Sequence, residues 1–376
     1  MKIAQIVASL EARHGGPSRS VRGLAGALAA VGHEVELLTT APDGAAAAET
    51  PAPNFSIRAF PRQWPAALTP SAPLRAHLRA GAFDIVHHHG LWLRPLHYAH
   101  EAAARAGVPL VVSPRGMMTP WAWRHRRWKK NLAARFIHPG ALAAVSGWHA
   151  TSEAEAGDIR RLGFTQPVCV APNGVEQPFA ADTAAAREHW LGLMPELAGR
   201  PAALFYSRFH SKKRVIELID LWLERAPHGW LLLLVGIPEE FSVETLRGYV
   251  YREGGEERVA VFDGTTLPPP YAVAELLLLP SHSENFGLVV AEALVHGLPV
   301  LATDTTPWAA LDAQGAGRCV PWKDFGPALT ALLGEGRDRL RARGADARTW
   351  AQAEFAWEKP ARTLAAFYDS LRARPA

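Results

Sequence analysis

Residues 280–299 read PSHSENFGLVVAEALVHGLP, and they determine how the second half of the chain can fold. The apolar run at 274–279 before them is typical of a buried parallel strand, and the apolar spacing over 288–295 predicts a helix packed on a sheet. Gly287, in the turn between the two, lets a ligand approach backbone N–H groups at the helix start. The stretch therefore predicts a strand, a turn and a helix whose N-terminus suits a phosphate.

Two carboxylates follow this strand, Glu284 in the turn and Glu292 in the helix. Glu292 falls about two turns into the helix, roughly 8 to 12 Å along it from a ligand at the first turn. Each residue also has an ordinary explanation, because acids are favoured near helix starts and on solvated helix surfaces. Their spacing alone leaves both explanations open.

The stretch resembles the E-x7-E signature of retaining glycosyltransferases of family 4, here in the form S-x-x-E-N-F-G-L-V-V-A-E-A-L-x-x-G-L-P-V. The resemblance covers essentially the whole chain and is strongest over 202–307. It implies that Glu284 contacts hydroxyl groups of a donor hexose and that Glu292 contacts the donor's ribose. It also implies a donor site lined by residues of the turn, namely Asn285, Phe286, Gly287 and Leu288.

The chain has 376 residues, of which 48% are hydrophobic and 20% charged, and its length favours two α/β domains. The family resemblance implies the GT-B fold, in which two Rossmann-like domains face each other across a cleft. We expect an acceptor-binding domain over 1–177 and a nucleotide-sugar-binding domain over 178–357. In the family, a C-terminal helix, here 358–376, crosses back to the first domain.

Several features bear on where the protein works. Cys169 and Cys319 are far apart and belong to no CxxC motif, which favours a reducing compartment and argues against structural zinc. The first residues, MKIAQIVASL, lack the apolar core of a signal peptide and predict a strand instead. We expect a cytoplasmic protein, and its net charge of +4 would suit nucleic acid, anionic lipid or a phosphorylated acceptor.

The first half opens with a strand, a glycine turn, a helix and a second strand, which is typical of a βαβ unit. Gly15 and Gly16 stand in that turn, but the GxGxxG fingerprint of dehydrogenases is missing. The two glycines suit an ordinary tight turn. The family resemblance implies instead that their backbone amides approach the donor's phosphate.

Three adjacent histidines, His87, His88 and His89, follow the strand predicted over 83–86. Neighbours on an extended segment point to opposite sides, so the three cannot reach one metal ion. By this alternation His87 and His89 share a face, opposite His88. Because ligands bind at the carboxyl ends of strands in open α/β sheets, we assign His88 and His89 to the acceptor side of the site.

Arg115 follows the next predicted strand, at 109–112. Several members of the family carry a histidine near this position, so the departure puts that histidine's role in doubt for this chain. An arginine there suggests an anionic group on the acceptor side.

Residues 121–135 form the densest basic and aromatic segment of the chain. One interpretation is a solvated basic helix with its tryptophans in the core. The other is a segment that contacts an anionic membrane or an acceptor phosphate, where each cation contributes about 1 kcal/mol. In a continuous helix, Arg126, Lys129 and Lys130 would share one side.

A second Rossmann-like unit begins with a strand predicted over 202–206, which leads into the basic loop SRFHSKKR. In the family an Arg and a Lys about five residues apart bind the donor diphosphate, which matches Arg208 and Lys213. Cations there would stabilise the departing nucleoside diphosphate. Gly236, after the next strand, would lie beside the nucleotide base, and a merely basic loop is the alternative for 207–214.

No DxD triplet occurs in the sequence, so we expect no metal and no other cofactor. Glu284, Arg208 and Lys213 are the predicted catalytic residues of a retaining hexosyltransferase. The motifs HHHGLW and SPRGMM-x-PW resemble family members that build bacterial lipopolysaccharide or surface polysaccharide. The alternatives are an epimerase-like or phosphorylase-like enzyme, a nucleic-acid-binding protein, and a catalytically silent binder of sugar nucleotides.

Overall fold

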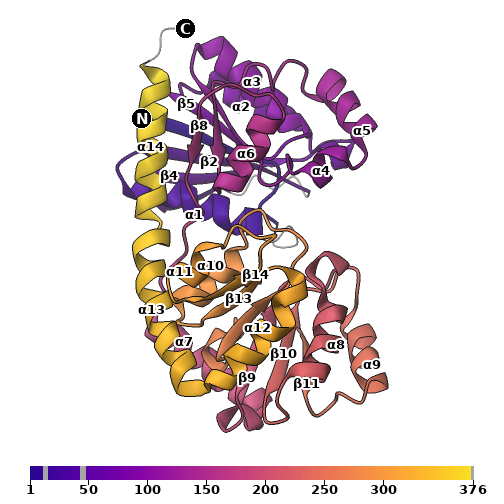
Figure 1. Cartoon of the computed structure of the whole chain (residues 1–376). Coiled ribbons are helices and arrows are strands. Elements are labelled where there is room, and N and C mark those ends of the chain that lie inside the picture. Colours follow the sequence, from indigo (N-terminus) through magenta and orange to yellow (C-terminus); the bar gives the residue numbers. More distant parts are fainter. Residues whose placement is uncertain (12–15, 43–47, 374–376) are drawn as a thin grey trace. The chain divides into compact units, whose positions relative to one another are not determined.

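The computed structural model of the chain describes residues 1–11, 16–42 and 48–373. Its contacts divide the chain into two α/β units, Met1–Gly174 together with Trp357–Ala376, and Val175–Ala356. Figure 1 shows that each unit has a central sheet covered by helices. The boundaries expected from the sequence, after residues 177 and 357, lie three residues and one residue further along the chain.

The first unit is built on a sheet with the strand order β3-β4-β2-β1-β5-β6-β7-β8. Its strands are β1 (Lys2–Val7), β2 (Glu34–Ala41), β3 (Ala48–Ala52), β4 (Phe55–Pro61), β5 (Ile85–His89), β6 (Leu110–Ser113), β7 (Gly147–Ala150) and β8 (Val168–Val170). The neighbours pair in parallel except for β3, which runs antiparallel to β4. The sequence of β3, AETPA, carries no apolar alternation that would mark it as a strand.

Helices cover both faces of this sheet. They are α1 (Gly16–Ala30), α2 (Ala72–Ala80), α3 (Arg94–Ala106), α4 (Pro120–Arg124), α5 (Arg127–Leu132), α6 (Glu153–Arg161) and α14 (Glu358–Arg372). One apolar core joins a face of the sheet to α1 and α14, and the other joins the opposite face to α2, α3 and α6. The C-terminal helix α14 therefore completes the core of the first unit, where it packs against α1.

The second unit has a sheet with the order β11-β10-β9-β12-β13-β14, in which the neighbours pair in parallel. Its strands are β9 (Ala202–Tyr206), β10 (Leu231–Gly236), β11 (Val259–Asp263), β12 (Leu276–Leu279), β13 (Val300–Thr303) and β14 (Gly317–Val320). Its helices are α7 (Ala180–Leu193), α8 (Val215–Arg225), α9 (Val243–Arg252), α10 (Leu288–Val295), α11 (Ala310–Ala313), α12 (Trp322–Glu335) and α13 (Arg337–Phe355). One core contains residues of α7, α10 and α13, and the other contains residues of α8, α9 and α12.

The strand order of each sheet marks the place where a ligand is expected to bind. In the second unit, the chain builds outward from β9 to β11, then returns to the other side of β9 with β12. The first unit makes the same reversal between β1 and β5. Open α/β sheets bind ligands outside the carboxyl ends of the two strands at such a reversal. A ligand is therefore expected at the loops after β9 and β12 and at the ends of β1 and β5.

Helix length also bears on membrane contact. Among the described residues, the helices are too short or too polar for any of them to cross a membrane.

Candidate functional site

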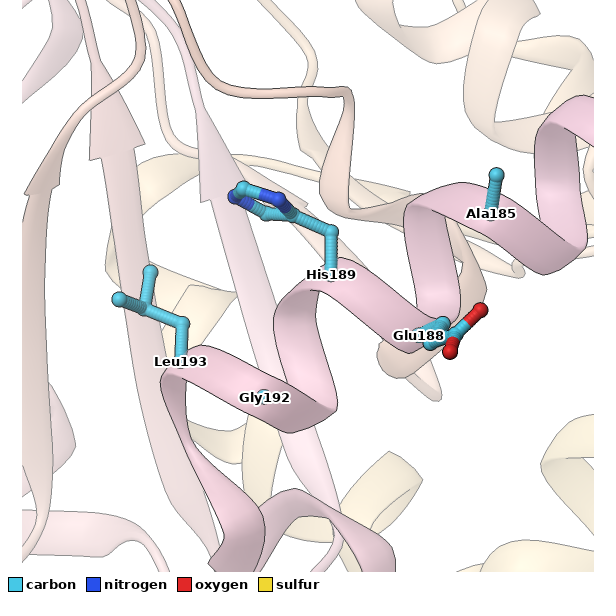
Figure 2. Close-up of a pocket in the computed structure, with 5 residues that line it drawn as sticks. All are labelled: Ala185, Glu188, His189, Gly192 and Leu193. Atoms are coloured by element: carbon cyan, nitrogen blue, oxygen red, sulfur yellow. The ribbon is translucent and has the colours of Figure 1, made fainter.

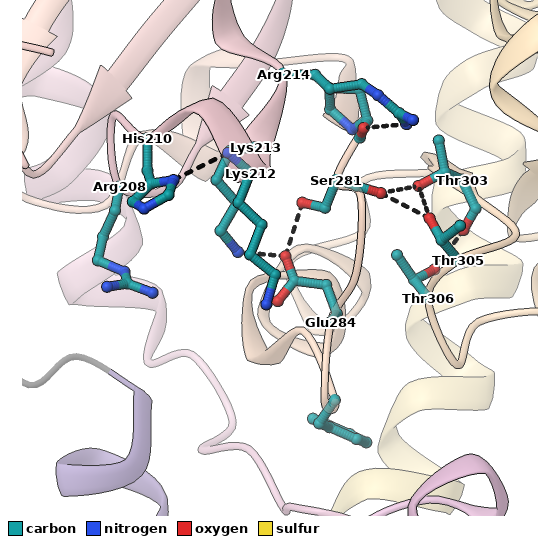
Figure 3. A network of polar contacts seen from close by, with 12 residues as sticks. Arg208, His210, Lys212, Lys213, Arg214, Ser281, Glu284, Thr303, Thr305 and Thr306 are labelled. Atoms are coloured by element: carbon teal, nitrogen blue, oxygen red, sulfur yellow. Dashed lines mark hydrogen bonds and ion pairs between the residues drawn. The ribbon is translucent and has the colours of Figure 1, made fainter. Parts of the chain in front are cut away.

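A buried ion pair joins the two loops at the reversal of the second sheet. Lys213 lies at the end of the short 3-10 turn Ser211–Lys213 after β9, and Glu284 lies in the loop after β12. The Lys213 Nζ donates a hydrogen bond to Glu284 Oε1, as Figure 3 shows. The side chains are only 10% and 13% exposed, so the two charges face each other with little screening by water.

Hydroxyl groups hold the Glu284 carboxylate in place. Ser281 Oγ donates to Glu284 Oε1 over 2.7 Å. The backbone oxygen of Ser281 in turn accepts hydrogen bonds from Thr303 Oγ1 at 2.6 Å and Thr305 Oγ1 at 2.7 Å (Figure 3). The position of the carboxylate is therefore fixed from the end of β13 as well as from its own loop.

Backbone contacts bind the two loops to each other. The His282 N–H donates to the Lys212 carbonyl at 2.9 Å, and Arg214 Nη1 donates to the Pro280 carbonyl at 3.1 Å. Because the loops are tied together on both sides of the ion pair, they form one local structure. The spacing of Lys213 and Glu284 follows from this structure, and their 71-residue separation in sequence could not reveal it.

The electrostatics of this site depend on one carboxylate among several cations. Burial by itself raises the pKa of Glu284, but Lys213 and Ser281 outweigh it, so the pKa lies below its usual value. Burial lowers the pKa of Lys212, Glu284 raises it again, and Lys213 and Arg208 lower it further. Lys212 was not among the predicted site residues, yet its side chain reaches toward Glu284 beside Lys213 (Figure 3).

Arg208, the other predicted cation, lies on the same loop with a side chain that is 47% exposed. Its guanidinium forms an ion pair with Glu239 at 2.9 Å. The structure thus brings Lys213 and Glu284 into direct contact, and places Arg208 close enough to influence the pKa of Lys212.

The turn before α10 has a backbone conformation that favours glycine. Gly287 is the N-cap of α10, with a φ of 77°, in the left-handed region that favours glycine. Phe286 is buried against Trp308, whose indole N–H donates to the Phe286 carbonyl. Phe286 is therefore part of the core, while Asn285 and Leu288 on either side of this turn are partly exposed.

Glu292 lies in the second turn of α10 and accepts a hydrogen bond from the Tyr271 hydroxyl at 2.7 Å. The Tyr271 ring packs edge-on against Tyr206, the last residue of β9, with ring centroids 5.6 Å apart. Glu292 is thus connected to the end of the strand that leads to Lys213. Sequence reasoning missed Tyr271, which no local motif marks.

The predicted glycines have different positions. At Gly236 a side chain would collide with the Ser207 carbonyl oxygen, so this glycine allows the loop that carries Arg208 to pass close to β10. Gly16 begins α1, and Gly15 lies outside the described residues.

On the first unit, the structure brings Arg115 and His89 together but separates them from His88. His87 and His89 share one face of β5, with ring centroids 4.2 Å apart, as strand alternation predicts. Arg115 Nη2 lies 3.0 Å from His89 Nδ1. His88 is buried on the opposite face, where its Nδ1 lies 3.1 Å from the Gly90 carbonyl.

Arg115 has a strained backbone and neutral hydrogen-bond partners. Its φ of 55° lies in the left-handed region, which residues with a side chain rarely adopt. Besides His89, its guanidinium donates to Asn173 Oδ1 at 2.7 Å. Burial lowers the pKa of Arg115 to about 10, so the group remains charged at neutral pH.

Neither a pocket on α7 nor a metal-binding cluster offers an alternative ligand site in the described residues. Figure 2 shows a pocket on α7 lined by Ala185, Glu188, His189, Gly192 and Leu193. It contains none of the predicted residues and no lysine or arginine, so it does not suit a diphosphate. Over 1–11, 16–42 and 48–373, no group of three or more His, Cys, Asp or Glu side chains is placed to hold a metal ion.

Comparisons with known proteins match this organisation. The sequence pattern of Glycosyltransferase Family 4 matches residues 14–177, and that of Glycosyl transferases group 1 matches residues 200–338. The chain is 30% identical to a D-inositol 3-phosphate glycosyltransferase of Jonesia denitrificans over 329 residues, which cover 78% of this chain and 73% of that protein.

Other relatives match over different lengths. A D-inositol 3-phosphate glycosyltransferase of Nocardia farcinica is 36% identical over 208 residues, but these span only 50% of this chain and 44% of that protein. A GDP-mannose:cellobiosyl-diphosphopolyprenol alpha-mannosyltransferase of Komagataeibacter xylinus is 25% identical over 78% of this chain and 73% of its own length.

Among solved structures, the fold is similar to that of a sucrose-phosphate synthase from Thermosynechococcus elongatus. The TM-score is 0.75 at 21% identity, and the match covers 99% of this chain and 100% of that one. The two parallel-sheet units are thus those of the GT-B fold. Together with the sequence matches, this shows that the chain belongs to the group 1 glycosyltransferases of family 4, enzymes that transfer a sugar from a nucleotide sugar.

Proposed function

We propose that this glycosyltransferase is a retaining, metal-independent hexosyltransferase that uses a nucleotide-diphosphate sugar. The observation that carries the proposal is the Lys213–Glu284 ion pair at the reversal of the second sheet, with Lys212 and Arg208 on the same loop. A diphosphate needs cations, and a hexose needs a hydroxyl-binding carboxylate beside them. This site supplies both at the place where open α/β sheets bind their ligands.

In the proposed mechanism, Lys213 stabilises negative charge as it develops on the leaving nucleoside diphosphate. A charge-assisted hydrogen bond of this kind strengthens as charge grows on the phosphate oxygens. Glu284 binds hexose hydroxyls and Glu292 binds the ribose. The acceptor attacks on the face from which the diphosphate departs, and a donor phosphate oxygen takes its proton, so the anomeric configuration is retained.

For the acceptor, we propose a saccharide or lipid-linked saccharide of bacterial lipopolysaccharide or surface polysaccharide, met at the inner face of the plasma membrane. The name of the Komagataeibacter xylinus relative includes a diphosphopolyprenol-linked acceptor, which favours this choice. The Jonesia denitrificans relative favours a second candidate, a small phosphorylated polyol acceptor. Arg115 is proposed for the acceptor side in both cases.

The basic aromatic segment, residues 121–135 together with the adjoining Phe136, supports membrane contact. Trp121, Trp128 and Phe136 are 66%, 63% and 62% exposed, which is unusual for such large side chains. Exposed cations surround them, namely Arg124, Arg126, Arg127, Lys129 and Arg135. Aromatic rings among cations suit the headgroup region of an anionic membrane.

The segment differs from the continuous helix considered from the sequence. Arg126 adopts a φ of 50° and separates α4 from α5. Lys130 Nζ donates to the carbonyls of Ala122 and His125 and thereby holds this bend. Trp123 packs on Trp92, with ring centroids 5.2 Å apart. Lys130 and Trp123 thus have structural roles, and the remaining exposed cations are the proposed lipid contacts.

Donor binding gives the first test of the proposed function. We expect the sugars of one nucleotide, UDP, GDP or dTDP, to raise the melting temperature of the protein. A ligand present at 100 times its Kd adds about 2.7 kcal/mol to the free energy of unfolding. No stabilisation by any of these sugars would contradict the donor site.

Replacement of Lys213 tests its role in catalysis. Lys213→Ala should lower kcat by roughly 100-fold or more, as loss of a group that stabilises transition-state charge does, and leave the acceptor KM nearly unchanged. Steady-state kinetics with the identified donor give both constants. Lys323→Ala, at an exposed lysine of α12, is the matched control and should leave kcat unchanged.

If Lys213→Ala raised only the acceptor KM, its proposed role would be wrong. Proton NMR of the first product reports the anomeric configuration in the same assay. An inverted product would contradict the retaining mechanism.

Vesicle flotation tests the basic aromatic segment. The triple variant Arg126→Glu, Lys129→Glu and Arg135→Glu should lose binding to phosphatidylethanolamine vesicles that contain phosphatidylglycerol. Each cation at an anionic surface contributes about 1 kcal/mol, so three reversals should weaken binding by at least roughly 100-fold.

The matched control reverses three exposed arginines elsewhere on the first unit, Arg58, Arg79 and Arg105. Equal loss of binding in this control would show that only overall charge matters. Unchanged binding of the triple variant would exclude the segment as a lipid contact.

A further inference from the structure

A chain of hydrogen bonds crosses the interior of the first unit from Arg115 to the end of β8. Its members are Arg115, His89, Gln5, Tyr368, His87, Ser113, His149 and the Ala171 carbonyl. They come from β1, β5, β6, β7 and α14 and from the loops after β6 and β8. The side chains of Gln5, His87, His89, Ser113, His149 and Tyr368 are almost completely buried.

The Arg115 end of the chain permits only one direction of donation. A guanidinium can only donate, so His89 Nδ1 must accept the hydrogen bond from Arg115. The proton of the neutral ring is then on Nε2, which donates to Gln5 Oε1. With its oxygen occupied in this way, the Gln5 amide directs its Nε2 to the Tyr368 hydroxyl, 3.1 Å away. Donation therefore runs from Arg115 to Tyr368.

The opposite end fixes the same direction independently. A carbonyl can only accept, so His149 Nε2 donates to Ala171 over 2.9 Å. Burial lowers the pKa of His149 to about 3, so the ring is neutral and its Nδ1 accepts from Ser113 Oγ over 2.7 Å. Ser113 has a single proton, so it must accept from His87 Nε2 at 2.7 Å. His87 Nδ1 then accepts from the Tyr368 hydroxyl at 2.6 Å.

The two halves meet at Tyr368 without conflict. Its hydroxyl accepts one hydrogen bond from Gln5 and donates its only proton to His87, so each proton of the chain has a single allowed place. His87, His89 and His149 must all be neutral, with the proton on Nε2. Burial, acting with neighbouring positive charge, lowers the pKa of His149 to about 3 and those of His87 and His89 well below their usual value.

The hydrogen-bond chain orients the Arg115 guanidinium, but none of its members carries a negative charge that would neutralise it. His89 and Asn173, the hydrogen-bond partners of the guanidinium among the described residues, are neutral, and no carboxylate of those residues lies within ion-pair distance of it. Glu155 acts on it only from further away, and its own oxygens accept from the Gly116 and Thr151 N–H groups. Arg115 is only partly exposed, and charges withdrawn from water are normally paired, so the missing partner is expected to be an anion. Three guanidinium N–H groups face His89 and Asn173, which leaves two for an oxyanion.

We propose that Arg115 binds an oxyanion, a phosphate or carboxylate group of the acceptor, and that Gln5, His89 and Tyr368 are its positioning residues. The claim that the anion belongs to the acceptor rests on the proposed function. The direction of the chain and the binding of an oxyanion do not, and they can be tested without donor or acceptor. Tyr368 gives α14 a direct part in the site, because it connects the C-terminal helix to β5.

NMR spectroscopy of the full chain labelled with ¹⁵N-histidine tests the direction of donation. His87, His89 and His149 should each show the neutral pattern with the proton on Nε2, unchanged from about pH 6 to about pH 8. His→Gln variants at the three positions assign the signals. A proton on Nδ1, or a doubly protonated ring, at any of the three histidines would contradict the proposed direction of donation.

Titration with inorganic phosphate tests the oxyanion site. Phosphate should shift the His89 Nδ1 resonance in the natural protein and have no such effect in Arg115→Gln. In Tyr368→Phe the apparent Kd should rise about tenfold, the loss expected when one hydrogen bond of about 1.4 kcal/mol is removed. Tyr98→Phe, which removes a hydroxyl from another buried tyrosine of the same unit, is the matched control and should leave the Kd unchanged.

Two outcomes would overturn the proposal. Phosphate that shifts His89 equally in Arg115→Gln would exclude Arg115 as the oxyanion group. An equal loss of affinity in Tyr98→Phe and Tyr368→Phe would show that general stability of the core, and not the chain, determines binding.

Discussion

The ion pair between Lys213 and Glu284 is the interaction on which the proposed site depends. It holds the loop after β9 against the loop after β12, at the point where the second sheet reverses its order. Two buried charges are costly to remove from water, and here the cost is offset by their contact and by the Ser281 hydroxyl. A donor diphosphate bound at this site would contact Lys213, the cation that Glu284 pairs with in the free protein. The free protein thus keeps a charged lysine ready for the donor, with Glu284 as its partner until the donor binds.

The two units use the same topology for opposite electrostatic purposes. At the reversal of the second sheet, cations and a carboxylate lie side by side and mutually shift their pKa values. At the reversal of the first sheet, three neutral imidazoles, an amide and two hydroxyls form a chain that ends on a single cation, Arg115. The first arrangement suits the stabilisation of charge that develops during reaction. The second suits the orientation of one charge in a fixed position.

Local sequence was sufficient to predict the strand, turn and helix around Gly287 and the shared face of His87 and His89. It was not sufficient where tertiary contacts decide. The continuous helix considered for residues 121–135 was wrong, because Arg126 takes a left-handed conformation that the basic, helix-favouring sequence does not reveal. Lys212 and Lys213 look alike in sequence, and only the fold gives Lys213 the contact with Glu284. Tyr368 is 363 residues from Gln5, so no spacing rule could join them.

A double-mutant cycle on the ion pair tests the central claim most directly. The free energy of unfolding at neutral pH is measured for the natural protein, Lys213→Met, Glu284→Gln and the double variant. Each single change leaves one buried charge without its partner and should cost about 3 to 5 kcal/mol. The double variant should cost no more than either single one, which corresponds to strong coupling. If the two single costs instead added to within about 0.5 kcal/mol, the residues would be independent and the account of this site would be contradicted.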